Sequence, residues 1–242
     1  MSNQSKKFHD YLDRSKKGSN PLSRLFFSVV RAIDPYIQYL IVVPGYGHQI
    51  ISKTGIVTIN PGQKGLVLVV MTAACTIKQI FHMTCILEEQ ISYPMILAIG
   101  IFDIITHSLA TLSSFIYGPS NGLGTLQYVG ISFFTVGILT ELISELQRKR
   151  FKNNPVNKGK IYSGGLFSLA RHINYGGFTL WRTGLVLTSG NYWLAALLFS
   201  LHTWDFTTRA IPCMADYCSK KYGEDWKKFE NDVPYTLFPY IC

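Results

Sequence analysis

The sequence predicts an all-α, polytopic membrane protein with about six transmembrane helices and a C-terminal cytoplasmic cap. Hydrophobic residues make up 48% of the 242-residue chain and charged residues only 15%, a balance typical of membrane proteins. Several apolar runs reach the roughly 20 residues that a helix needs to cross a bilayer. Basic residues gather in segments between these runs, as expected for the cytoplasmic loops of such a protein.

Six apolar runs support the span count. Four are long and strongly apolar: residues 65–86, 93–117, 125–146 and 190–211. Two are weaker: residues 25–44, interrupted by Arg31 and Asp34, and residues 166–188. If all six cross the bilayer, the N-terminus, the basic loop after residue 147 and the C-terminal tail lie on one side. The positive-inside rule predicts that this side is cytoplasmic.

The basic loop also suggests a division of the chain. We expect a cytoplasmic tail, a transmembrane scaffold, a basic cytoplasmic loop, and then a cofactor-binding membrane hairpin with its C-terminal cap. The corresponding ranges are 1–24, 25–147, 148–160 and 161–242.

Composition narrows the kind of partner. The net charge of +9 would suggest nucleic acid in a soluble protein, but here it fits membrane topology, so we expect a membrane and no nucleic acid. The five cysteines are odd in number and none has C-x-x-C spacing. We therefore expect reduced thiols and no metal site. The sequence makes no prediction about oligomeric state.

The run at 166–188 carries an unusual set of polar residues. Helical spacing predicts that Arg171, Tyr175, Phe178 and Arg182 form one stripe, with Asn174 beside it. Two guanidinium groups on one stripe would bind a phosphate or a carboxylate. The alternative is that Arg171 and its neighbour His172 extend to the membrane interface. The glycines at 164, 165, 176 and 177 allow either close helix packing or the approach of a cofactor.

The last apolar run contains a second polar set. His202, Asp205 and Arg209 share a helical face, and Asp205 can pair with Arg209 one turn later. The pair is either internal to the helix or part of the site. Pro212 is expected to break the helix and let the following residues fold back onto the membrane surface.

Other ionisable residues lie in the scaffold spans, where each is a functional candidate by default. Asp103 and His107 are one turn apart, and hydrogen bonding between helices is the favoured explanation for them. Four further residues are expected near the membrane interface: Lys78, His82, Glu141 and Glu145.

The last third of the chain resembles a superfamily of integral-membrane enzymes. The order of Gly165-Leu166-Phe167, the RHINY motif at 171–175, a membrane hairpin and KYGEDWKKFENDVPYTLFPYI at 221–241 carries the resemblance. The superfamily includes sterol C14- and C7-type reductases, steroid 5-alpha-reductases and isoprenylcysteine carboxyl methyltransferases. The tail is most similar to the sterol reductases.

The resemblance implies a nucleotide-bearing cofactor, NADPH in the reductases and S-adenosylmethionine in the methyltransferases. It further implies that Arg171, His172, Asn174 and Tyr175 contact the cofactor. Two residues of the tail, Tyr222 and Trp226, would close over it. The chain departs from the family pattern at Ile173, at residues 176–178 and at residues 213–215, where proline, an acid and a charged cluster are usual.

The leading hypothesis is an NADPH-dependent reductase of a carbon–carbon double bond in a sterol-like or other membrane lipid. Arg171 and Arg182 would bind phosphates, Asp205 and Arg209 would replace the missing charged cluster, and Tyr175 or His202 would deliver the proton. The alternative is an S-adenosylmethionine-dependent methyltransferase of a lipid or prenylated substrate, and a third is a scaffold without chemistry. A lipid substrate would enter from the bilayer. For either enzyme, we expect the endoplasmic reticulum as the membrane.

Overall fold

The computed structural model describes residue 18 and residues 20–241, and this part of the chain is helical, as predicted. The scaffold contains α1 (Pro21–Val42), α2 (Tyr46–Ser52), α3 (Gly62–Phe81) with a π-helical turn (His82–Ile86), α4 (Tyr93–Ser113) and α5 (Thr125–Asn153). After two 3₁₀ turns (Pro155–Asn157 and Gly165–Ser168) come α6 (Ile173–Thr188) and α7 (Tyr192–Asp205). A second π-helical turn (Phe206–Ala210), α8 (Ile211–Tyr222) and α9 (Glu224–Asp232) complete the fold.

Four helices are long and apolar enough to cross a membrane: α1, α3 with its π-helical turn, α4 and α5. These long apolar helices identify an integral membrane protein. The two other predicted spans form helices of 16 residues in α6 and 14 residues in α7, shorter than the roughly 20 residues of a straight span. In the described part of the chain, the candidate spans therefore number four by length and composition, so the six predicted spans are not confirmed.

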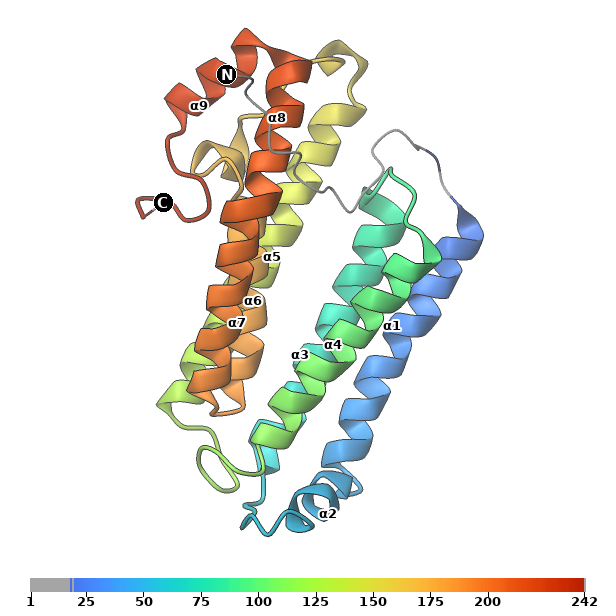
Figure 1. Cartoon of the computed structure of the whole chain (residues 1–242), viewed down its shortest axis with the longest axis vertical. Coiled ribbons are helices and arrows are strands. Elements are labelled where there is room, and N and C mark those ends of the chain that lie inside the picture. The colour runs from blue at the N-terminus through green and yellow to red at the C-terminus, as the bar shows by residue number, and fades with distance from the viewer. Residues whose placement is uncertain (1–17, 19, 242) are drawn as a thin grey trace, which may run out of the picture.

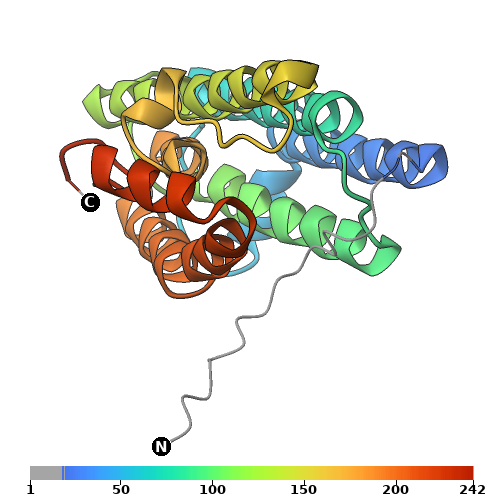
Figure 2. The same ribbon diagram turned by 90° about the horizontal axis from the view of Figure 1, so that it is seen from above.

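The helices form two groups along the long axis of the molecule. Figure 1 shows α1, α3 and α4 on one side and α5, α6 and α7 on the other, with α2 at one end and α8 and α9 at the opposite end. Seen from above, α1 and α8 lie at opposite edges (Figure 2). A hydrophobic cluster that includes Leu68, Met71, Phe134, Trp181 and Leu185 joins α3, α5 and α6.

Two predicted breaks differ from the structure. The helix α5 continues to Asn153, so the first residues of the predicted loop 148–160 are helical. At Pro212 the chain does not fold back: α7, the π-helical turn and α8 continue along one line (Figure 1). Pro212 lies just after the π-helical turn, near the start of α8. The direction changes at Gly223, whose φ of 55° favours glycine.

Glycines bring α5 and α6 into backbone contact. Gly130 and Gly137 on α5 lie against Gly184 and Gly177 on α6, and each pair is spaced by seven residues, about two helical turns. A Cβ at Gly177 would lie 2.8 Å from the backbone nitrogen of Glu141. Gly177 therefore serves close helix packing, one of the two uses that the sequence left open.

The substitution Gly177→Val should separate α5 from α6 and lower the free energy of unfolding by about 1–3 kcal/mol, because the added atoms meet backbone. Thermal unfolding in detergent measures the effect. The control is Gly122→Val, since nothing lies within 4 Å of a Cβ at Gly122. Equal melting temperatures for the two variants would contradict the packing role of Gly177.

Candidate functional site

The RHINY motif lies where the C-terminal tail meets the N-terminal end of α6. Arg171 and His172 precede the helix, which begins at Ile173. Their backbone N–H groups donate to the carbonyl oxygens of Tyr235 (2.9 Å) and Thr236 (2.8 Å). The tail is thereby fixed beside the motif, which brings together two segments that the resemblance placed in one site.

Arg171 binds the tail through its side chain as well. Its Nη1 donates to the carbonyl oxygens of Val233 at 2.6 Å, Glu230 at 3.2 Å and Pro234 at 3.3 Å. Because Arg171 lies before the helix, it does not continue the α6 stripe of Tyr175 and Arg182 as the helical spacing predicted.

Aromatic rings extend from the motif toward α7. The His172 ring stacks on Tyr175, with centroids 5.4 Å apart, and Tyr175 stacks on Phe206 at 4.6 Å. Phe178 turns its ring edge-on to Phe206 at 5.5 Å and to His202 at 5.4 Å. The two predicted catalytic residues, Tyr175 and His202, thus belong to one ring cluster and are connected through Phe178 and Phe206.

Asn174 is held by a helix that the sequence did not assign to the site. Its Nδ2 donates to Oε1 of Glu145 on α5 at 2.8 Å, and Oε2 of Glu145 accepts from Arg148 at 2.5 Å. Glu145 is 3% exposed, so it is packed inside the helical bundle, and its depth in the membrane stays a prediction. The sequence did not indicate this contact because the partner on α6 is distant in sequence.

A second carboxylate, that of Glu141, is also paired inside the bundle, one turn earlier on α5. The carboxylate of Glu141 pairs with the ammonium of Lys78 on α3 and accepts from Nε1 of Trp181 on α6 at 2.6 Å. Both Lys78 and Glu141 are buried. They neutralise each other inside the bundle rather than extending to the interface.

Arg182 belongs to a buried ionic network that connects α6 with α4 and α1. Its Nη2 lies 2.6 Å from Oδ1 of Asp103 on α4, while Oδ2 of Asp103 lies 3.2 Å from Nη2 of Arg31 on α1. Gln79 of α3 donates to the same Oδ2 at 3.0 Å. The guanidinium of Arg182 also lies over the Phe178 ring, 4.5 Å from its centroid.

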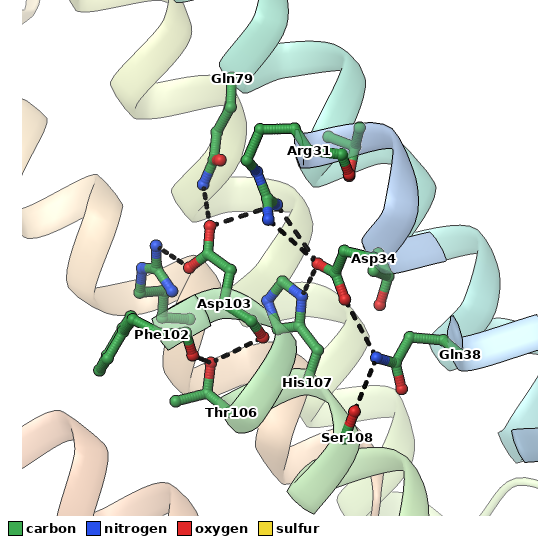
Figure 3. A network of polar contacts seen from close by, with 12 residues as sticks. Arg31, Asp34, Gln38, Gln79, Phe102, Asp103, Thr106, His107 and Ser108 are labelled. Carbon is green, nitrogen blue, oxygen red and sulfur yellow. Dashed lines mark hydrogen bonds and ion pairs between the residues drawn. The ribbon is translucent and has the colours of Figure 1, made fainter. Parts of the chain in front are cut away.

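The network continues along α1 and α4. Oδ2 of Asp34 lies 3.3 Å from Nη1 of Arg31 and 2.7 Å from Nδ1 of His107. Gln38 donates to the other oxygen of Asp34 at 3.0 Å and to Ser108 at 3.1 Å. The predicted role of Asp103 and His107 in hydrogen bonding between helices is confirmed for both residues (Figure 3).

The remaining predicted residues lie on α7, α8 and α9. Asp205 and Arg209 pair with each other, Nε to Oδ1 at 2.6 Å and Nη2 to Oδ2 at 2.5 Å. The Tyr222 hydroxyl accepts from Lys152 at 2.8 Å. Trp226 is buried in a second hydrophobic cluster that contains Ile173 at the start of α6. The cap is therefore packed onto the motif, whereas the side of the membrane on which it lies remains a prediction.

The chain belongs to the family DUF1295, described as "Protein of unknown function (DUF1295)", whose pattern matches residues 76–233. This match confirms the superfamily that the motif and tail resemble.

Relatives of this chain match it over different lengths. A protein of Ustilaginoidea virens named "Probable O-methyltransferase ustE" is 36% identical over 244 residues, which cover 90% of this chain and 86% of the relative. The protein-S-isoprenylcysteine O-methyltransferase of Schizosaccharomyces pombe is 30% identical over 74 residues, 31% of each chain. The 7-dehydrocholesterol reductase of Danio rerio is 30% identical over 88 residues, 36% of this chain and 18% of the relative.

The ring of His172 should make stability depend on pH. His172 lies outside the four candidate spans, and burial, followed by the charges of Arg171 and Arg148, lowers its pKa to about 4. The unfolded chain, with a pKa near ~6.5, then binds more protons between these values. The free energy of unfolding should fall by at most about 3 kcal/mol as pH drops from ~6.5 to ~4.

Unfolding measured across this pH range for the wild type and for His172→Gln tests this, because the variant lacks the titrating ring. The free energy of unfolding of the wild type minus that of the variant should increase as pH rises from ~4 to ~6.5. Parallel curves would show that His172 does not contribute.

Proposed function

We propose that the protein is an integral-membrane enzyme that uses S-adenosylmethionine to methylate an oxygen atom of a lipid-soluble substrate. The observation that carries this proposal is the similarity to the Ustilaginoidea virens protein named as an O-methyltransferase, which extends over 90% of this chain. That similarity includes most of the scaffold helices as well as the motif. Similarity to the Danio rerio reductase covers only 36% of the chain.

The arrangement of charges fits this cofactor. The positive charge of Arg182 is matched by Asp103 and shielded by three aromatic rings, so it adds little to phosphate binding. S-Adenosylmethionine carries no phosphate, and its sulfonium is a cation. Tyr175 is the middle ring of the stack with His172 and Phe206, so the Phe206 ring at the end of the stack would offer the π face that attracts a cation.

The residues of the chain then have distinct roles. Bound S-adenosylmethionine would supply an activated methyl group, and catalysis requires chiefly that the substrate oxygen be aligned with it. Asn174 and His172 would orient the cofactor, and the tail at residues 233–238 would cover it and exclude water. We assign His202 to accept the proton of a hydroxyl substrate.

A reduction of a carbon–carbon double bond with NADPH is the second candidate. It is favoured by the matches to sterol reductases, among them the Delta(14)-sterol reductase ERG24 of Candida albicans, 33% identical over 87 residues. In this case Arg171 and Arg182 would bind phosphates, Asp205 and Arg209 would complete the cofactor site, and Tyr175 would donate the proton. For both candidates we propose a lipid substrate and the endoplasmic reticulum as the membrane.

Calorimetry with the detergent-purified protein separates the two candidates. We expect S-adenosylmethionine to bind and NADPH not to bind under the same conditions. Arg171→Ala should weaken binding, because the tail loses the side-chain bonds that fix it beside the motif. Binding of NADPH alone would overturn methyl transfer in favour of reduction, and binding of neither cofactor would remove both.

A second experiment addresses the cationic methyl donor. Phe206→Leu should weaken the binding of S-adenosylmethionine more than that of S-adenosylhomocysteine, which lacks the transferred methyl group and the sulfonium charge. The expected difference is about twofold to thirtyfold, corresponding to a cation–π contribution of ~0.5–2 kcal/mol. The control is Tyr128→Leu, on the exposed surface of α5. An equal loss for both ligands would exclude a charge-specific role for Phe206.

A further inference from the structure

The carboxylate of Glu145 accepts hydrogen bonds from one neutral and one positively charged side chain. One oxygen accepts from the amide nitrogen of Asn174 and the other from the guanidinium of Arg148. Glu145 is 3% exposed and reaches Asn174 across the interface between α5 and α6. A buried carboxylate is retained at low cost only where it is paired and hydrogen-bonded, as it is here.

This contact fixes the orientation of the Asn174 amide. An ionised carboxylate only accepts hydrogen bonds, so the amide must turn its NH₂ group toward Glu145. The carbonyl oxygen Oδ1 of Asn174 then faces away from Glu145. Arg148 binds the other carboxylate oxygen and so holds Glu145 in this position.

We propose that Glu145 is a positioning residue, which acts by holding Asn174 so that its carbonyl oxygen is presented to the cofactor. The ligand group would be an N–H donor, such as an amino group of S-adenosylmethionine. The inference rests on the proposed function insofar as Asn174 contacts the cofactor.

Glu141 offers a matched control. It lies one turn earlier on the same helix, is also buried, and also joins α5 to α6, through Trp181. Its carboxylate contacts Lys78 and not Asn174. Loss of Glu141 should therefore report the structural effect of removing a buried carboxylate from this interface.

The test is a double-mutant cycle measured as the dissociation constant of S-adenosylmethionine by calorimetry. The variants are Glu145→Leu, Asn174→Ala, the two combined, and Glu141→Gln. We expect Glu145→Leu to weaken binding about tenfold or more, within the range of coupling between contacting residues. In the Asn174→Ala background the same change should have no further effect. Glu141→Gln should lower the melting temperature and leave binding within about twofold.

Glu145→Gln gives a second route if Glu145→Leu does not fold. Glutamine can present either an oxygen or an NH₂ group to Asn174, so the amide orientation is no longer fixed. Binding should again weaken, and only where Asn174 is present. Equal losses with and without Asn174, or an equal loss for Glu141→Gln, would overturn the positioning role.

The wild-type measurement distinguishes this inference from the proposed function. If the wild type binds NADPH alone, methyl transfer fails, and the same cycle with NADPH decides the role of Glu145. If it binds neither cofactor, the proposed function and this inference both fall.

Discussion

The carboxylate of Asp103, shared between two arginines inside the helical bundle, is the interaction on which the arrangement of the helices depends. Asp103, Arg31 and Asp34 are all 0% exposed. An unpaired charge at such depth costs several kcal/mol, and removing one partner of a buried pair strands the other. The charges of two arginines and two aspartates cancel in this network. The helices α1, α4 and α6 can therefore contain charged residues in an apolar environment. The scaffold is thus joined to the motif-bearing helix by charge as well as by packing.

The face of α5 toward α6 combines two kinds of contact in sequence order. Gly130 and Gly137 let the backbones touch along one half of the interface. Further along the same face, Glu141 and Glu145 add side-chain hydrogen bonds to Trp181 and Asn174. The glycines fix the distance and register of the two helices. Each carboxylate therefore lies opposite one particular partner on α6. Rigid packing in one half therefore orients polar groups in the other.

Local patterns were sufficient for the fold class and for part of the polar network. Apolar runs predicted the positions of the long helices, and the one-turn spacing of Asp103 and His107 pointed to contacts between helices. The burial of Glu145 and Lys78 was not predictable in this way, because each is neutralised by a residue from another helix. The full length of α5 and the continuity of α7 with α8 were also missed. A proline such as Pro155 or Pro212 favours a helix end nearby but does not determine the residue at which a helix ends.

The beginning of α6 depends on a segment some sixty residues later in the chain. The first N–H groups of a helix lack partners within it, and here the tail carbonyls of Tyr235 and Thr236 accept from the two residues before α6. Free N–H groups at a helix start would form a phosphate site. At this start of a helix, Arg171 and His172 donate to the tail, while Ile173 and Tyr175 inside α6 donate to the carbonyl oxygens of Ala170 and His172. The start of α6 and the tail are thus hydrogen-bonded into one unit.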